Sequence, residues 1–279
     1  MTLQGIDVSG WQPESITRDV DYDFAIIKIS EGTSFRASLA AAQYQGAKER
    51  GKLLGVYHFA STEDPAAEAD HFVATAQPYL REALLVLDFE ADAIDAWGGK
   101  GAKVFLDRVY ARTGIKPLIY CSGSVAARAD MKPVADAGYP LWVASWGANQ
   151  SGGYRVPPVP SAGQWDEVTI HQYTSNGVLP GYAGRLDLNV TPITPAEWST
   201  LASGDRKTVA QLAAEVWAGL WGNGRDRAAR LTAAGYDYPA VQAEVNRGRT
   251  PTTSEVRAVW VAAGRSGDEF DRWVRTWTR

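Results

Sequence analysis

The chain has 279 residues, of which 45% are hydrophobic and 22% charged, with a net charge of −4, and this composition is that of a globular protein. Its length allows one large domain and a small one. The single cysteine, Cys121, excludes an internal disulfide framework, and the three histidines lack the spacing of a zinc hydrolase. No apolar run reaches the length of a membrane span, and the first residues lack the pattern of a secretory signal peptide. We therefore expect synthesis in the cytoplasm and no membrane insertion.

The predicted elements alternate between strands and helices over the first half of the chain. Such alternation predicts parallel strands joined by right-handed crossovers, and about eight strands favour a closed barrel. Helical patterns become rare after residue 138, so we expect an irregular, TIM-like (β/α) barrel with fewer helices than strands. The expected strands are 4–8, 24–29, 53–59, 84–90, 118–121, 141–145, 169–173 and 186–190, and the early helices are 36–50, 64–80 and 100–113.

The fourth strand carries the most informative motif. It is an apolar run that ends in two acids, Asp88 and Glu90. Side chains alternate along a strand, so the two carboxyl groups are expected on one face, roughly 6.5 Å apart along the strand. Like charges held close together raise one pKa, which is the chemistry of glycoside cleavage. The alternative is a strand end running into solvent with ordinary surface acids.

Other strands also end in polar or aromatic side chains. Asp7 lies near the end of the first strand and Asp187 lies on the last, so acids from three strands are predicted to meet at one end of the barrel. Taken singly, Asp7 could cap a loop and Asp187 could form an Asx turn. His58 is interpreted as an interior residue whose polar atoms are satisfied. The cleft is also expected to include Tyr57, Tyr120, Trp146 and Gln172.

The last part of the chain reads as helical. We place the end of the first domain at residue 202 and a linker at 203–207. Residues 208–247 form a predicted three-helix bundle, near the lower size limit for independent folding, in which Trp217 and Trp221 are expected to belong to the core. Residues 248–279 are expected to form a helical extension of unknown role.

Four motifs, in this order, resemble glycoside hydrolase family 25, whose members are N-acetylmuramidases of bacteria and bacteriophages. The resemblance covers roughly residues 3–200 and rests on Gly5–Gln12, Gly55–Phe59, Asp88–Glu90 and Arg185–Asn189. It implies an irregular barrel and hydrolysis of the β-1,4 bond between N-acetylmuramic acid and N-acetylglucosamine in peptidoglycan.

The same resemblance implies roles for the residues of the cleft. Glu90 matches the general acid/base and Asp88 its neighbouring carboxylate. Asp7 and Asp187 match the other two acids. Tyr57, Tyr120 and Trp146 match sugar-facing aromatics. The chain departs from the family at His171, where a Trp is frequent, and we expect this change to alter a wall of the cleft.

Residues 212–242 resemble the cell-wall-binding repeat found at the C-terminus of some phage lysozymes. The resemblance implies recognition of the muropeptide backbone, and the contacts expected from it are Asn223, Arg225, Arg230, Tyr236 and Tyr238. Only one copy is found, so avidity from linked copies would be absent. The whole chain thus resembles a phage endolysin, which would reach the wall through a separate membrane hole, a holin.

Two mechanisms and several other functions remain open. Glu90 is expected to protonate the leaving oxygen. The substrate's own acetamido oxygen could then attack, giving retention, which we favour, or a water activated by Asp7 or Asp187 could attack, giving inversion. The alternatives in function are a catalytically inactive wall-binding protein, a chitinase-like glycosidase, and a metal-dependent barrel hydrolase, for which the histidine spacing gives no support. No cofactor, metal or nucleic-acid partner is predicted, and the oligomeric state is left open.

Overall fold

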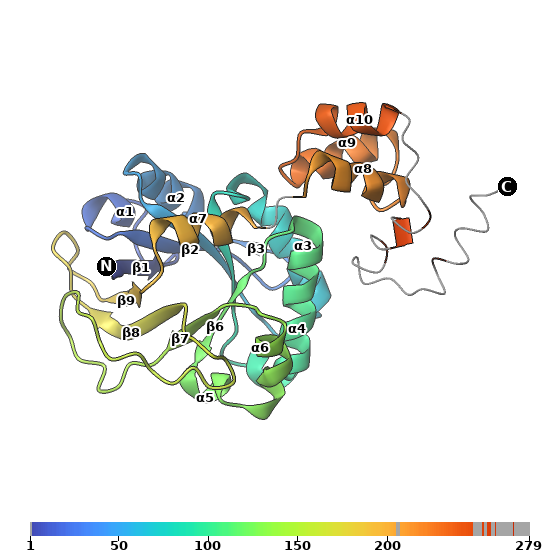
Figure 1. Cartoon of the computed structure of the whole chain (residues 1–279). Helices are drawn as coiled ribbons and strands as arrows, with labels where there is room; N and C mark the ends of the chain where they lie inside the picture. Colours follow the sequence, from blue (N-terminus) through green and yellow to red (C-terminus); the bar gives the residue numbers. More distant parts are fainter. Residues whose placement is uncertain are drawn as a thin grey trace. The chain divides into compact units, whose positions relative to one another are not determined.

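The computed structural model describes residues 2–204 and 207–247, together with the single positions 253, 256, 257, 260 and 270 (Figure 1). The chain divides into two compact units, Met1–Gly204 and Asp205–Arg279. In the described part, no helix has the length and apolarity needed to cross a membrane.

The first unit is a closed barrel, as predicted, with helices around it (Figure 1). Neighbouring strands pair in the order β1-β9-β8-β7-β6-β5-β4-β2, and β1 closes the ring by pairing with β2. The short strand β3 forms a hairpin with the end of β2. The strands are β1 (Leu3–Val8), β2 (Phe24–Glu31), β3 (Phe35–Arg36), β4 (Leu53–Phe59), β5 (Ala83–Asp88), β6 (Leu118–Ser122), β7 (Leu141–Ala144), β8 (Ile170–Gly177) and β9 (Leu186–Thr191).

The second half of the barrel is irregular because its last strand runs antiparallel to its neighbours. Strands β1, β2, and β4 to β8 pair in parallel, whereas β9 is antiparallel to both of its neighbours, β8 and β1. The connection from β8 to β9 contains no helix, and a short connection without a crossover can only join antiparallel strands. The parallel pairing expected for the alternating first half is present, and the irregularity expected in the second half lies in the antiparallel last strand.

The helices follow the predicted order with shifted ends. The helix expected at 36–50 begins only at Ala40, because Phe35 and Arg36 pair with the end of β2. The helix expected at 100–113 begins earlier, at Ala93, and a kink at Gly98, with φ of 55°, joins the two parts of this helix, α4. The helices of this unit are α1 (Ile16–Asp19), α2 (Ala40–Glu49), α3 (Pro65–Ala76), α4 (Ala93–Thr113), α5 (Gly123–Ala126), α6 (Lys132–Asp136) and α7 (Pro195–Ser203), with single 3₁₀ turns at Gln77–Tyr79 and Ala129–Met131.

Helix α7 closes the end of the barrel at which the parallel strands begin. Its Trp198 is 1% exposed, packs at a tilt against Phe24 at the start of β2 with the ring centres 4.9 Å apart, and donates its indole N–H to the carbonyl of Leu54 at 3.0 Å. Trp198 and Phe24 belong to the inner core, which also contains Val86 and Ile170. Because one end is filled in this way, only the end where the parallel strands finish is left for a site.

The second unit contains α8 (Val209–Trp217), α9 (Gly224–Ala233) and α10 (Tyr238–Asn246). Thr208 and Gln211 form a capping box at the start of α8. The prediction that Trp217 and Trp221 belong to the core is confirmed, since both pack against it. Most of the extension predicted at 248–279 lies outside the described residues. Buried core residues of the bundle are Leu212, Ala213, Val216, Leu231, Val241 and Val245.

Candidate active site

A cavity of about 250 Å³ lies at the open end of the barrel. The four acids predicted from the sequence line it, as do Tyr57, Tyr120, Trp146 and Gln172. These side chains come from β1, β4, β5, β6, β8, β9 and the loops that follow β5 and β7. The lining residues are Asp7, Ser9, Trp11, Lys28, Tyr57, Phe59, Asp88, Glu90, Tyr120, Trp142, Trp146, Gln172, Ser175 and Asp187.

The four acids reach the cavity by different routes. Asp7 and Asp187 are direct neighbours in the antiparallel register of β1 and β9. Asp88 is the last residue of β5, and Glu90 lies in the loop beyond it. The prediction that Glu90 lies on a face of this strand is therefore wrong, because the strand ends two residues earlier. Both side chains nevertheless line the same cavity.

Burial keeps protons on this acidic cluster. Desolvation, reinforced by the charges of Glu90 and Asp7, raises the pKa of Asp88 well above its usual range. Burial likewise raises the pKa of Glu90, and Lys28 opposes that rise. The pKa of Asp187 is raised to about 8 by burial and by the charges of Asp7 and Glu90. These four carboxyl groups therefore cannot all be ionised at neutral pH, and the cavity can supply a proton.

Gln172 organises one wall of the cavity. Its side-chain oxygen accepts hydrogen bonds from the Tyr120 hydroxyl at 2.9 Å and the Trp146 indole N–H at 2.8 Å. Its amide N–H donates to Asp7 at 3.0 Å. Gln172 is 3% exposed, so each of these bonds fixes a side chain with little competition from water. One amide thereby orients two aromatic groups and one acid.

A second amide, Asn189, supports the same acid. It donates to Asp7 at 2.6 Å and accepts from the Trp142 indole N–H at 2.9 Å. Burial raises the pKa of Asp7, but the hydrogen bonds from Asn189 and Gln172 limit the rise to about 6. Asp7 is thus the acid of the cluster with the most complete set of partners. By contrast, Asp88 Oδ1 is buried and has no hydrogen-bond partner among the described residues.

Sequence reasoning missed a cation in the cavity. Lys28 is the only positively charged group among the described residues that line it. Its ammonium group donates to Glu31 at 2.7 Å and lies 4.4 Å from the centre of the Phe59 ring. A lysine within the apolar run Phe24–Ile29 was the available signal. The other lining residues outside the predicted set are Ser9, Trp11, Phe59, Trp142 and Ser175.

Neither buried histidine of the barrel lines the cavity. The expectation that His171 alters a wall of the cleft is wrong, because alternation along β8 directs Gln172 to the cavity and its neighbours to the outer layer. His171 instead donates from Nε2 to the carbonyl of Ser145 at 2.9 Å, and burial lowers its pKa. The interpretation of His58 as a satisfied interior residue is confirmed by its bonds to Ser30 and Glu68.

The predicted wall-binding residues lie in the second unit. Asn223, Arg225 and Arg230 are exposed at the start of α9 or along it, and Tyr236 and Tyr238 are half-buried. The Arg230 guanidinium lies 5.9 Å from the Trp221 ring centre and donates to the carbonyl of Leu220 at 3.0 Å. Tyr236 packs edge-on against Trp221 at 6.1 Å. Arg230 and Tyr236 thus share one aromatic neighbour.

A barrel that gathers protonated carboxyl groups and aromatic side chains at the ends of its strands is the architecture of a glycoside hydrolase. The sequence model of "Glycosyl hydrolases family 25" matches residues 6–182, and that of the CW_7 repeat matches residues 210–248. The chain belongs to glycosyl hydrolases family 25 and carries a CW_7 repeat in its second unit.

Named relatives and solved structures agree with this assignment. The chain is 31% identical to Lysozyme M1 of Streptomyces globisporus over 211 residues, covering 67% of each protein. It is 30% identical to the lysozyme of Streptococcus phage Cp-7 over 252 residues, covering 87% of this chain and 67% of that one. A bacterial lysozyme from Streptomyces coelicolor has a similar structure, with a TM-score of 0.60, 30% identity, and coverage of 72% of this chain and 97% of its own.

Proposed function

We propose that this protein is a muramidase that hydrolyses the β-1,4 bond between N-acetylmuramic acid and N-acetylglucosamine in bacterial peptidoglycan. The observation that carries the proposal is the single cavity lined by Asp7, Asp88, Glu90 and Asp187, in which burial retains protons. Membership of family 25 supports it, as does 34% identity over 143 residues to an N,O-diacetylmuramidase of Chalaropsis.

Glu90 is the proposed general acid. It is only partly buried, so its carboxyl group can reach a glycan in the cavity, and its raised pKa favours the protonated form needed to donate to the leaving oxygen. Tyr57, Tyr120 and Trp146 are the proposed sugar-facing aromatics of the cavity, and Gln172 is the polar substrate-binding residue beside them.

The proposed route to products is substrate-assisted. The acetamido oxygen of the sugar attacks the anomeric carbon while Glu90 gives its proton to the leaving oxygen, and water then opens the cyclic intermediate with retention. Asp88 supports this route, because its Oδ1 lacks a partner among the described residues and can accept the acetamido N–H. NMR of the products immediately after cleavage tests it. We expect the β-anomer first, and the α-anomer would exclude the substrate-assisted step.

Digestion of purified peptidoglycan tests the activity itself. The fragments are reduced with borohydride and analysed by mass spectrometry, which identifies the sugar at each new reducing end. We expect reduced muramic acid. Reduced glucosamine would indicate a glucosaminidase, and the absence of new ends at enzyme concentrations that saturate the wall would indicate a wall-binding protein without catalysis.

We also propose a division of labour along the chain. Residues 1–202 form the catalytic part, 203–207 a linker and 208–247 a module that binds the muropeptide part of the wall, supported by the match to the CW_7 repeat. The likeness to a phage lysozyme supports a role in host lysis, in which the enzyme acts at the bacterial wall after release from the cytoplasm. Release through a holin remains part of this proposal.

Binding to purified wall fragments tests the module. Arg225 is exposed at the start of α9, and we expect Arg225→Ala to weaken sedimentation with the wall severalfold. Arg247→Ala, which removes another exposed arginine, at the end of α10, is the matched control. Equal binding by the two variants would remove Arg225 from the proposed contacts.

A further inference from the structure

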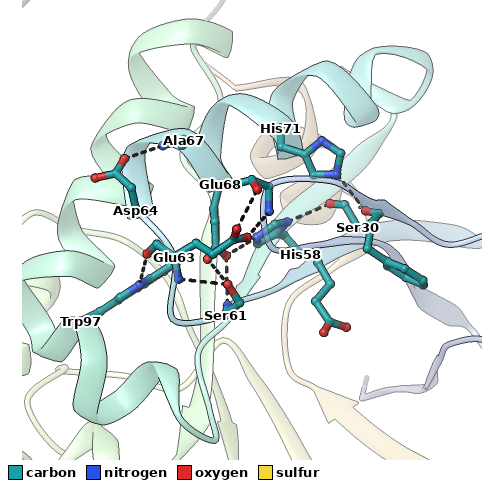
Figure 2. Close-up of polar contacts among 12 residues, drawn as sticks. Ser30, His58, Ser61, Glu63, Asp64, Ala67, Glu68, His71 and Trp97 are labelled. Carbon is teal, nitrogen blue, oxygen red and sulfur yellow. Dashed lines mark hydrogen bonds and ion pairs between the residues drawn. The ribbon is translucent and has the colours of Figure 1, made fainter.

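A buried chain of polar side chains lies among β2, β4 and α3 (Figure 2). Ser30, His58 and Glu68 have no exposed surface. Ser30 Oγ is 2.9 Å from His58 Nδ1, and His58 Nε2 is 2.9 Å from Glu68 Oε2. Ser61, in the loop after β4, donates its backbone N–H to Glu68 Oε2 at 3.0 Å and its hydroxyl to Oε1. The imidazole ring thereby connects two strands and a helix, and Glu68 extends the connection to the loop after β4.

The direction of these hydrogen bonds follows from the charges. Burial raises the pKa of Glu68, but the bonds from His58 and Ser61 outweigh it, so the pKa is lowered and the group is ionised. Burial lowers the pKa of His58. A neutral His58 must donate from Nε2 to the carboxylate, and its Nδ1 is then the acceptor for the Ser30 hydroxyl. The chain has a single consistent arrangement of protons, which is the condition for a rigid network.

The Ser30–His58 bond lies at an irregularity in the barrel. Lys28 pairs with Tyr57, but the next pair is Ser30 with His58, so β2 has one extra residue at this point. Without the extra residue, alternation would direct Ser30 to the same side as Lys28. The bulge turns Ser30 to the outer layer, where it meets His58, and leaves Lys28 and Tyr57 at the cavity.

We propose that His58, held between Ser30 and Glu68, is a positioning residue for the muramidase reaction proposed above. By fixing the bulge in β2, it keeps Lys28 and Tyr57 at the cavity wall. His58 itself has no exposed surface and does not line the cavity. Its effect is therefore exerted through the two strands on which Lys28 and Tyr57 lie.

The position of Lys28 has an electrostatic consequence that can be measured. Its ammonium group donates to Glu31 on β2 and lies near the Phe59 ring. Its charge also acts on Asp88, at the end of β5, and on Glu90, in the loop beyond it. The Lys28 charge lowers the pKa of both Asp88 and Glu90 against the effect of burial. Displacement of Lys28 would raise both pKa values. The other charged or titratable groups acting on His58, besides Glu68, are Lys28 itself and His71 on α3.

Ser30→Ala is the decisive variant, because it removes one hydroxyl and leaves His58 and Glu68 in place. Thr113→Val is the matched control. Thr113 is also buried, its hydroxyl donates to the carbonyl of Val109 at 2.8 Å, and it ends α4, the helix that leads into the start of β6. Ser30→Thr, which restores a hydroxyl, is the rescue variant. Thermal unfolding of all three variants gives the cost of each change to stability.

The activity readout is the pH profile of kcat/KM on soluble muropeptide chains. We expect Ser30→Ala to lose about tenfold in kcat/KM, since small displacements of substrate-contacting groups are costly, and its basic limb, which reports protonated Glu90, to move to higher pH. Ser30→Thr should recover both properties, and Thr113→Val should change neither. The proposal would be overturned if Ser30→Ala lost no more kcat/KM than Thr113→Val, or if it lost kcat/KM while its basic limb stayed at the same pH.

A second readout needs no turnover. The ¹³C NMR titration of the Glu90 carboxyl group should have its midpoint at higher pH in Ser30→Ala than in the unmodified protein. An unmoved midpoint overturns the positioning role whether or not the enzyme cleaves peptidoglycan. If the unmodified protein produces no new reducing ends, the proposed function is refuted. The NMR titration then tests the role of His58 by itself.

Discussion

Burial of an ionised carboxyl group is costly, and two buried carboxyl groups of the first unit, Glu68 and Asp88, meet this cost in opposite ways: one is ionised and the other keeps its proton. Glu68 accepts hydrogen bonds from His58 and from the backbone and hydroxyl of Ser61, and its pKa is lowered. Asp88 has one buried oxygen without a partner among the described residues, lies near other acids, and has a raised pKa. A buried acid with a full set of donors is ionised and holds elements together. A buried acid with too few donors keeps its proton and is available to a substrate.

The largest expected effect concerns the acid proposed as the proton donor. Glu90→Gln retains the shape of the side chain but cannot donate a carboxylic proton, so we expect turnover to fall about 10³-fold. Glu90 has a raised pKa because burial penalises its charge, and the stability of the variant should therefore be unchanged or slightly greater. Peptidoglycan turnover and urea unfolding measure the two quantities. Near-normal turnover would assign the proton donor to another acid.

Substitution of Glu68, the buried acid with a full set of donors, should instead lower the stability of the fold. Glu68→Gln exchanges one acceptor oxygen for an amide that faces the donors of His58 and Ser61, so we expect the free energy of unfolding to fall by about 4 kcal/mol. Asp70→Asn, on the solvent side of the same helix, is the control, because Asp70 is a surface partner of Arg108 and Arg112. Similar unfolding curves for the two variants would refute the distinction between Glu68 and an ordinary surface acid.

The difference between a buried acid with a raised pKa and one with a lowered pKa also predicts how stability depends on pH. The folded-state pKa of Asp7 is raised from 3.8 to about 6. Between these values the folded protein retains a proton that the unfolded chain releases, so the contribution of Asp7 to stability falls by about 3 kcal/mol as the pH rises through this range. The contribution of Glu68 has the opposite sign, because it is present above the unfolded pKa and is lost as the pH falls through the lowered folded value.

Asp7→Asn isolates this pH effect. The amide oxygen can still accept from Gln172 and Asn189, so the variant should remain folded while losing the titration. Urea unfolding at several pH values from 4 to 7 should show a shallower decline in stability with rising pH than in the unmodified protein. Parallel curves for the two proteins would mean that Asp7 titrates normally in the folded state.

Much of this arrangement could be predicted from the sequence, because the signals are local. Apolar runs followed by polar residues located the strands to within a few residues, and the acids at their ends converge in the structure. Features set by distant contacts could not be predicted. The bulge that separates Lys28 from Ser30 depends on the pairing of β2 with β4. The outward direction of His171, by contrast, follows from alternation along β8 once Gln172 is placed at the cavity, so the expectation for His171 conflicted with that for Gln172.

The smallest expected effect provides the most direct comparison of the two buried acids. Asp88→Asn and Glu68→Gln are the same chemical change at two buried sites of one barrel. Asp88 destabilises the folded state at neutral pH because burial opposes its ionisation, so an amide there should slightly raise the free energy of unfolding while turnover falls. The sign of the change in stability is then opposite at the two sites. If both variants are destabilised to a similar extent, missing donors do not explain the proton held by Asp88. The number of hydrogen-bond donors would then not distinguish the acids of the cavity from Glu68.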